Sequence, residues 1–258
     1  MFTYQRWKQT HASETQTLNV FPVSLLTSCT QHQQAPLLVL VGKTHPYLTA
    51  QITAVYRYQV AHGHELMKLR CLNGTHSALA YLGYLAGYQT ISDAVADPAF
   101  TRLCERLWHD EILPTVPQPE GEDLPAYCAA LMSRYYNPAI QHRTWQIAMD
   151  GSQKLPQRIL GTLRDIVAAG RMPKGLCLVI AGWMRYVAGT NEAGQAIDVR
   201  DPMADQLEAA ARSADPVTAL LSIKAIFGSD LAGNADVVAA IQSAYQHLLD
   251  EGAAKTVM

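Results

Sequence analysis

The pattern of hydrophobic and polar positions changes about sixty residues into the chain. Residues 1–35 are rich in Thr, Gln, Ser and His and show no clear period. Residues 36–44 (PLLVLVGKT) form a short apolar run that ends at a glycine. This run predicts a buried strand leading into a turn, or poorly ordered chain. From about His64 onward, apolar residues recur at the spacing of amphipathic helices. We therefore predict a mainly α fold of many helices, preceded by a short segment that is irregular or partly β.

Capping residues, prolines and glycines divide the helical part into separate elements. Helices are expected to start at Ser92, at Asp97-Pro98 and at Asp123, because serine and aspartate are good N-caps and proline is tolerated in the first turn. Asn137-Pro138 is expected to end a helix, and the polar stretch 150–156 to interrupt one. The longer predicted helices cover residues 64–87, 98–108, 123–135, 143–149, 158–169, 176–187, 202–213, 216–227 and 235–251.

The composition supports a folded domain and excludes several classes of protein. Hydrophobic residues make up 49% of the 258 residues and charged residues only 16%, a balance that gives a core and argues against disorder. The formal net charge is −2, so we predict no surface for nucleic acid or for an anionic membrane. No leader-like start and no run of ~18 apolar residues is present, so neither secretion nor a membrane span is expected.

The cysteines and histidines do not indicate a metal site. There are five cysteines, an odd number, and no pair has C-x-x-C spacing. This pattern argues against a disulfide framework and against a zinc ribbon, and it predicts reduced core cysteines in a cytoplasmic protein. The nine histidines are scattered along the chain, so no metal is expected.

Lys68, Asn73 and His76 are the first candidates for chemistry. On an α-helix, at about 100° per residue, Asn73 lies roughly 140° and His76 roughly 80° from Lys68, so all three fit on one side of a helix. A lysine buried among the surrounding leucines has a lowered pKa and can exchange a proton with a hydroxyl or ketone oxygen. Asn73 can donate to that oxygen, and His76 can hold the lysine or a nearby hydroxyl. The alternative is an ordinary amphipathic helix whose polar residues face water.

A second candidate group surrounds the Asp150-Gly151 pair. Lys154 follows the pair, while Arg143 precedes it and Arg158 comes after it. Arginine binds a carboxylate bidentately and lysine binds it as a point charge, so these cations suit an acidic substrate. The alternative is a helix break with solvated cations.

The sequence gives no nucleotide-binding signature. No G-x-G-x-x-G/A motif follows a strand anywhere in the chain, which argues against a dinucleotide fingerprint. Residues 36–44 superficially suggest a phosphate loop, but Leu37 stands where that loop requires glycine.

The Lys68-x4-Asn73-x2-His76 spacing, within KLRCLNGTHSALAYLGYLAGY, resembles the signature of the mannitol dehydrogenase family, the polyol-specific long-chain dehydrogenases. Three further segments are similar to the fructuronate reductase branch of that family. They are RTWQIAMDGSQKLPQRIL (residues 143–160), AGWMRYVAGTNEAGQ (residues 181–195) and the run from DP to LLSIKAIFGSDL (residues 215–231). The resemblance covers roughly residues 62–258.

The resemblance implies a multi-helical C-terminal domain from a two-domain enzyme. Residues 61–258 would form the substrate-binding and catalytic domain, and residues 1–60 an atypical remnant or poorly ordered segment. NAD(H) would be bound mainly by a Rossmann domain missing from this chain, so the chain is expected to be inactive alone. No cofactor-binding residue is assigned.

The implied reaction is the NAD-dependent reduction of D-fructuronate to D-mannonate. Lys68 would give the proton to the ketone oxygen, while Asn73 and His76 position that oxygen. Gln146 stands where mannitol-oxidising members tend to carry arginine, which fits a hexuronate or aldonate substrate. Lys154 and Arg143 would bind its carboxylate, and Arg158 is a further candidate for substrate binding.

Two alternatives stay open at this point. Within the same class, the protein would be a mannitol 2-dehydrogenase or a tagaturonate reductase. In a different class, it would be an inactive helical remnant that binds a sugar acid. The sequence does not predict an oligomeric state.

Overall fold

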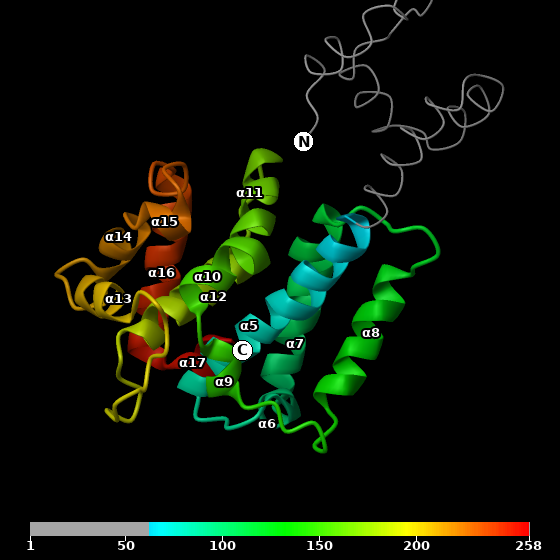
Figure 1. The fold of residues 1–258 in the computed structure, drawn as a ribbon, viewed down its shortest axis with the longest axis horizontal. Coiled ribbons are helices and arrows are strands. Elements are labelled where there is room, and N and C mark those ends of the chain that lie inside the picture. Colours follow the sequence, from blue (N-terminus) through cyan, green and yellow to red (C-terminus); the bar gives the residue numbers. More distant parts are fainter. Residues whose placement is uncertain (1–61, 258) are drawn as a thin grey trace, which may run out of the picture. The chain divides into compact units, whose positions relative to one another are not determined.

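A computed structural model describes residues 62–257 of the chain (Figure 1). This part is helical, and within it the only β-type pairings are two isolated bridges, Thr90 with Arg143 and Thr190 with Ala196. The predicted mainly α fold is therefore confirmed for the described residues. The strand predicted at residues 36–44, and residues 1–60 as a whole, lie outside them.

The described helices are mostly short. A continuous helix runs from residue 62 to Leu85, and its middle is π-helical. The elements, in chain order, are η1 (Lys68–Gly74), α5 (Thr75–Leu85), α6 (Ile91–Ala96), α7 (Pro98–Arg106), η2 (Leu107–Ile112), η3 (Leu113–Thr115), α8 (Leu124–Tyr135), α9 (Thr144–Ala148), α10 (Gly151–Leu155), η4 (Pro156–Leu160), α11 (Gly161–Ala168), α12 (Lys174–Val187), α13 (Ala204–Ala211), α14 (Pro216–Leu221), α15 (Lys224–Phe227), α16 (Ala235–Glu251) and α17 (Ala253–Thr256).

The N-termini of several helices follow the capping residues in the sequence. Asp97 accepts a hydrogen bond from the backbone of α7, and Asp123 from the backbone of α8, as predicted. The prediction for α6 is wrong by two residues, because the cap is Thr90 rather than Ser92. Thr90 forms a capping box with Asp93, in which each side chain accepts from the other residue's backbone N–H.

The core is built around α5 and α12. Both helices are buried along most of their length, and α12 packs against α5 and against α16. Gly182 of α12 makes the contact with α5 close, since a Cβ there would lie 2.6 Å from Leu82 Cδ2. The buried interior includes Tyr81 and Trp183. The four cysteines of the described part are free and buried, consistent with the prediction of reduced core cysteines.

Three π-helical segments interrupt the α-helices of the described part. Pro156 opens η4, and Pro114 follows η2 by two positions. Proline has no backbone N–H and its ring crowds the carbonyl four residues earlier, so a wider turn lets the helix continue past it. The predicted interruption at 150–156 is present but shorter, because α9 ends at Ala148 and the chain is helical again from Gly151 to Ala168. The helix predicted over 216–227 is split into α14 and α15.

Within residues 62–257, every helix is too short or too polar to cross a membrane.

Candidate active site

The π-helical segment η1 carries Lys68 and Asn73 and ends just before His76. Its wide turn leaves backbone carbonyls that side chains from other helices satisfy. The Cys71 carbonyl accepts from Trp108 Nε1 at 2.9 Å and from Thr75 Oγ1 at 2.6 Å. The Leu72 carbonyl accepts from the Tyr135 hydroxyl at 3.1 Å. These donors stabilise a backbone geometry that local sequence does not favour.

Close packing and one ion pair fix η1 against the rest of the domain. Gly74 has no side chain, so the Arg158 carbonyl of η4 can approach it; a Cβ at Gly74 would lie 3.1 Å from that oxygen. The largely buried Arg70 guanidinium pairs with the Asp165 carboxylate at 2.6 Å and donates to the Thr115 carbonyl at 2.9 Å. Residues from α11 and η3 therefore hold the segment that carries the candidate catalytic groups.

The structure changes the expected relation between Lys68 and Asn73. A π-helix bonds residue i to residue i+5, which brings residues five apart closer to one face than the roughly 140° of an α-helix. Lys68 is exposed, and Asn73 is partly exposed. The burial predicted for Lys68 is therefore wrong within the described residues, because Met67 and Cys71 face the core while the Lys68 side chain is exposed.

His76 lies in a partly buried aromatic and cationic environment. Its ring packs on Tyr135 at 4.8 Å between centroids, and on His142 edge-to-face at 5.7 Å. Burial and, to a smaller extent, the charges of His142, Arg158 and Arg134 together lower the pKa of His76 to about 4. The imidazole is therefore neutral at pH 7 and can both donate and accept a hydrogen bond.

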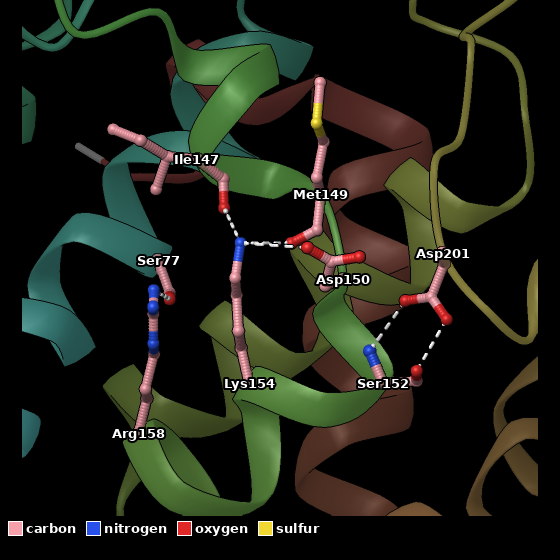
Figure 2. Close-up of polar contacts among 8 residues, drawn as sticks. All are labelled: Ser77, Ile147, Met149, Asp150, Ser152, Lys154, Arg158 and Asp201. Carbon is pink, nitrogen blue, oxygen red and sulfur yellow. Dashed lines mark hydrogen bonds and ion pairs between the residues drawn. The ribbon is translucent and has the colours of Figure 1, made fainter.

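Lys154 and Arg158 lie on successive turns of the helix that follows the Asp150-Gly151 pair (Figure 2). The Lys154 Nζ donates to the Met149 carbonyl at 2.6 Å and to the Ile147 carbonyl at 3.4 Å, and lies 3.7 Å from the Asp150 carboxylate. Burial lowers the pKa of Lys154, the nearby charge of Arg158 lowers it further, and Asp150 acts in the opposite direction.

Arg158 connects this cationic group to the helix that bears His76. Its guanidinium donates to Ser77 Oγ at 3.3 Å, and Ser77 is the neighbour of His76 in α5. Burial lowers the pKa of Arg158 as well. Arg158 is therefore partly desolvated by burial. Among the described residues, no carboxylate pairs with it, so its positive charge has no counter-charge there.

The other two predicted substrate residues lie apart from these contacts. Arg143 precedes α9 and Gln146 lies within it, and both are exposed. Neither side chain forms a hydrogen bond or ion pair within residues 62–257. The structure thus places Arg158 close enough to act on both His76 and Lys154, and leaves Arg143 and Gln146 at the surface.

Three residues at the site were missed by the sequence analysis. Ser77 receives Arg158, while Arg134 and His142 line a small pocket with His76 and Tyr135. Arg134 comes from α8 and His142 from the loop before α9. No sequence spacing links them to His76, because their proximity results from the packing of separate helices.

The arrangement presents groups of the kind that exchange protons and bind anions. Lys68 and Asn73 offer an exposed ammonium and carboxamide, His76 offers a neutral imidazole, and Arg158 offers a positive charge without a counter-ion. No group of three or more His, Cys, Asp or Glu side chains in the described part is arranged to hold a metal.

Comparison with known proteins identifies the fold and its relatives. A family model described as the mannitol dehydrogenase C-terminal domain matches residues 60–249. The chain belongs to the mannitol dehydrogenase family. The resemblance seen in the Lys68-Asn73-His76 motif is therefore confirmed at family level.

Among curated members of the mannitol dehydrogenase family, D-mannonate oxidoreductase of Escherichia coli (strain K12) is 52% identical to the chain over 196 residues, which cover 75% of this chain and 40% of that protein. A mannitol 2-dehydrogenase of Phaeosphaeria nodorum is 35% identical over 212 residues, which cover 82% of this chain and 37% of that protein.

The solved structures agree with this assignment to the mannitol dehydrogenase family. The ternary complex of Pseudomonas fluorescens mannitol 2-dehydrogenase with NAD and D-mannitol matches with a TM-score of 0.74 at 32% identity, over 76% of this chain and 40% of that one. A D-sorbitol dehydrogenase shares the fold, with a TM-score of 0.69 at 22% identity. The chain spans about 40% of the length of these relatives.

Proposed function

We propose that residues 61–258 form the substrate-binding and catalytic domain of an NAD-dependent oxidoreductase that interconverts D-fructuronate and D-mannonate. The observation that carries the proposal is the half-buried Arg158, which has no carboxylate partner in the described residues and lies beside Ser77 and His76. A hexuronate or aldonate carboxylate would supply the missing negative charge. The 52% identity to a D-mannonate oxidoreductase, against 35% to a mannitol 2-dehydrogenase, supports the same choice.

The four cationic or polar candidates then take different parts. Arg158 and Lys154 would bind the carboxylate, since they lie on successive turns and burial lowers the pKa of both. Arg143, just before α9, and Gln146, within it, are exposed and would contact the substrate from a second side. Gln146 would add no charge there, which suits a substrate whose carboxylate is already paired with Arg158 and Lys154.

The proton step is assigned to Lys68. Its ammonium would donate a proton to the ketone oxygen as the alcohol forms, and its neutral amine would accept that proton in the reverse reaction. Asn73 would donate a hydrogen bond to the same oxygen while negative charge develops on it. The neutral His76 would accept from, or donate to, an adjacent hydroxyl of the sugar chain.

NAD(H), when bound, supplies or takes up the hydride. The described residues contain no β-strand beyond the isolated bridges, and a dinucleotide site of the Rossmann type needs the carboxyl edge of a parallel sheet. Residues 62–257 therefore do not fit the cofactor by themselves. We propose that its main binding site lies outside the described residues.

A domain exchange tests the proposal. Residues 62–249 of this chain would replace the matching segment of the E. coli D-mannonate oxidoreductase, and NADH-dependent rates would be measured with D-fructuronate, D-tagaturonate and D-fructose. We expect the highest kcat/KM with D-fructuronate, by at least about tenfold. A preference for D-fructose or D-tagaturonate would assign the domain to one of the alternative dehydrogenases.

Substitution of Lys154 and of Arg143 in the exchange protein tests the carboxylate site. Lys154→Ala is expected to raise the KM for D-fructuronate about tenfold or more, because a charged hydrogen bond to substrate is lost, and to change the KM for D-fructose little. Arg143→Ala is likewise expected to raise the KM for D-fructuronate, because Arg143 would contact the substrate from the second side of the site. Lys255→Ala in α17 provides the control, and unchanged KM values for both site variants would contradict the assignment.

Calorimetry on the complete 258-residue chain tests the remaining alternative. Binding of D-mannonate without any activity in the exchange protein would indicate a domain that has kept its ligand and lost its chemistry. Failure of the chain to bind D-mannonate, together with an inactive exchange protein, would overturn the proposed function.

A further inference from the structure

A loop distant in sequence holds the turn from which Lys154 and Arg158 project. The Asp201 carboxylate accepts from the Ser152 backbone N–H at 2.8 Å and from Ser152 Oγ at 2.5 Å (Figure 2). The same carboxylate accepts from the Met203 backbone N–H at 2.9 Å. Ser152 is buried in the first turn of α10, so Asp201 satisfies a helix-start donor that water cannot reach.

Further contacts join the same two segments. We call residues 198–203 the strap. The Asp150 N–H donates to the Arg200 carbonyl at 2.9 Å, and Trp145 Nε1 donates to the Asp198 carbonyl at 2.8 Å. The Arg200 guanidinium also lies 4.7 Å above the Trp145 ring. The strap therefore binds the residues before, within and after the Asp150-Gly151 pair.

The opposite side of the turn is fixed by tight packing. A Cβ at Gly151 would lie 2.3 Å from Trp183 Nε1 and 2.9 Å from the Tyr81 hydroxyl. Neither of these two buried polar atoms has a hydrogen-bond partner among the described residues. Asp150 itself has a φ of 54°, a left-handed conformation that is uncommon for residues other than glycine and that aspartate adopts more readily than most.

The position of Lys154 depends on this turn. Its ammonium is held by the carbonyls of Ile147 and Met149, which lie on one side of the Asp150-Gly151 pair, while its backbone lies on the other side. If the turn shifted, the carbonyls would move away from the ammonium. Arg158 is one helical turn further along the same helix and would move with it.

We infer that Asp201 is a positioning residue for the carboxylate-binding group, acting through Ser152 and the Asp150-Gly151 turn to hold Lys154 and Arg158 in place. The inference rests on the proposed function for the identity of the ligand. A site of this kind is accurate only when the residues behind the contacting side chains are themselves held by hydrogen bonds. Asp201 does not touch the ligand; it determines where the contacting cations lie.

The test uses the complete chain and two independent readouts. The first is the rate at which acetic anhydride labels the Lys154 amine, measured by mass spectrometry, which needs no ligand. The second is the Kd for D-mannonate by calorimetry. The variants are Asp201→Asn and Ser152→Ala, the second removing only the hydroxyl bond. Asp198→Asn is the matched control, since within residues 62–257 its carboxylate pairs only with Arg200 in the same strap.

We expect Asp201→Asn to change the labelling rate of Lys154 at least about threefold and to weaken D-mannonate binding about tenfold, because a charge-assisted bond to the turn is lost. Ser152→Ala should change both in the same direction and by less, and Asp198→Asn should change neither. Combining Asp201→Asn with Lys154→Ala should weaken binding by less than the sum of the two single losses, because Asp201 acts in part through Lys154.

Unchanged labelling of Lys154 in both Asp201→Asn and Ser152→Ala would overturn the inference, whatever happens to the melting temperature. Fully additive losses in the double variant would overturn it as well. If the unaltered chain does not bind D-mannonate and the exchange protein is inactive, but Asp201→Asn changes the labelling, the positioning role stands and the proposed ligand is wrong.

Discussion

At the scale of single residues, the site is defined by charges that are partly removed from water. Lys154 is held by two backbone carbonyls and lies near Asp150 and Arg158, whose opposite effects on its pKa partly cancel. Arg158 has only a serine hydroxyl as a side-chain partner within the described residues. An incoming carboxylate would therefore bind two cations whose hydration is already reduced, which lowers the cost of desolvating them on binding.

The titration of His76 provides a direct check on this environment. Its pKa of about 4 lies below that of an unfolded histidine, so between about pH 4 and pH 6.5 the unfolded chain binds more protons than the folded chain. Stability should therefore fall as pH drops through this window, by at most about 3 kcal/mol from this residue. We expect NMR titration of the His76 ring to give a midpoint near pH 4.

The matching control for His76 is the variant His76→Gln, which removes the titrating ring. The difference between the pH–stability curves of the unaltered chain and this variant should be confined to the same pH window. An NMR midpoint close to 6.5 would show that the ring is hydrated and that Arg158, Arg134 and His142 do not act on it as described.

Gly151 tests how tightly the turn before Lys154 is packed. In Gly151→Ala the new methyl group would meet Trp183 Nε1 and the Tyr81 hydroxyl at 2.3 and 2.9 Å, and neither ring is free to move because both are buried. We expect a loss of roughly 1–3 kcal/mol in the free energy of unfolding, the usual cost of overpacking a core. Urea unfolding followed by circular dichroism measures it.

Gly63→Ala is the appropriate comparison for Gly151→Ala. Gly63 is also helical, and its added Cβ would make only ordinary contacts with Pro119 at 3.7 Å or more. Its replacement should be neutral or stabilising by up to about 1 kcal/mol, since alanine favours helix more than glycine. Equal effects of the two substitutions would mean that the Gly151 contact is not tight.

Sequence reasoning identified some of these residues and missed others for a physical reason. Lys68, Asn73 and His76 were found because they share one helix, where spacing determines their neighbours. Ser77 and Asp201 were missed, since they reach Arg158 and Ser152 from segments 81 and 49 residues away. Such contacts depend on how helices pack, which no local pattern encodes.

At the scale of elements, helix starts were predictable and helix width was not. Asp97 and Asp123 act as caps because their side chains bond to the next turn, a local property of the sequence. The π-helical η1 depends instead on Trp108 and Tyr135, which donate to its carbonyls from other helices. The α-helical angles first assigned to residues 68–74 therefore could not have been corrected from the sequence.

The start of α12 depends on a cap from another element. Glu111 of η2 accepts from the Gly175 and Leu176 N–H groups at 2.7 and 2.8 Å. Because α12 forms the centre of the core, Glu111→Ala should cost about 1–2 kcal/mol of unfolding free energy, the usual cost of removing a cap. Asp110→Ala, at the exposed neighbouring position, should cost little. Thermal unfolding of both variants measures the two losses in unfolding free energy. Equal losses for Glu111→Ala and Asp110→Ala would show that the cap does not stabilise α12.

At the scale of the whole molecule, the exposed face of η1 determines what the domain can do alone. Prolines, caps and apolar spacing were sufficient to predict a mainly α domain. They did not predict that Lys68 is exposed, because exposure depends on which surfaces are covered by packing. An exposed lysine is well hydrated, so the proposed proton transfer requires a substrate or a further domain to cover it.

The last prediction concerns Lys68 in an assembled enzyme. In the exchange protein with the E. coli D-mannonate oxidoreductase, Lys68→Ala should lower kcat for D-fructuronate by about 10²–10⁴-fold, the usual effect of losing a general acid. Its melting temperature should not change, because the Lys68 side chain is exposed and has no hydrogen bond within residues 62–257. Lys224→Ala, at an exposed lysine of α15, should leave both quantities unchanged. A kcat that stays within about threefold of the unaltered exchange protein would remove Lys68 from the proton step. A large fall in melting temperature would instead show that Lys68 has a structural role. The exposure of its side chain argues against such a role.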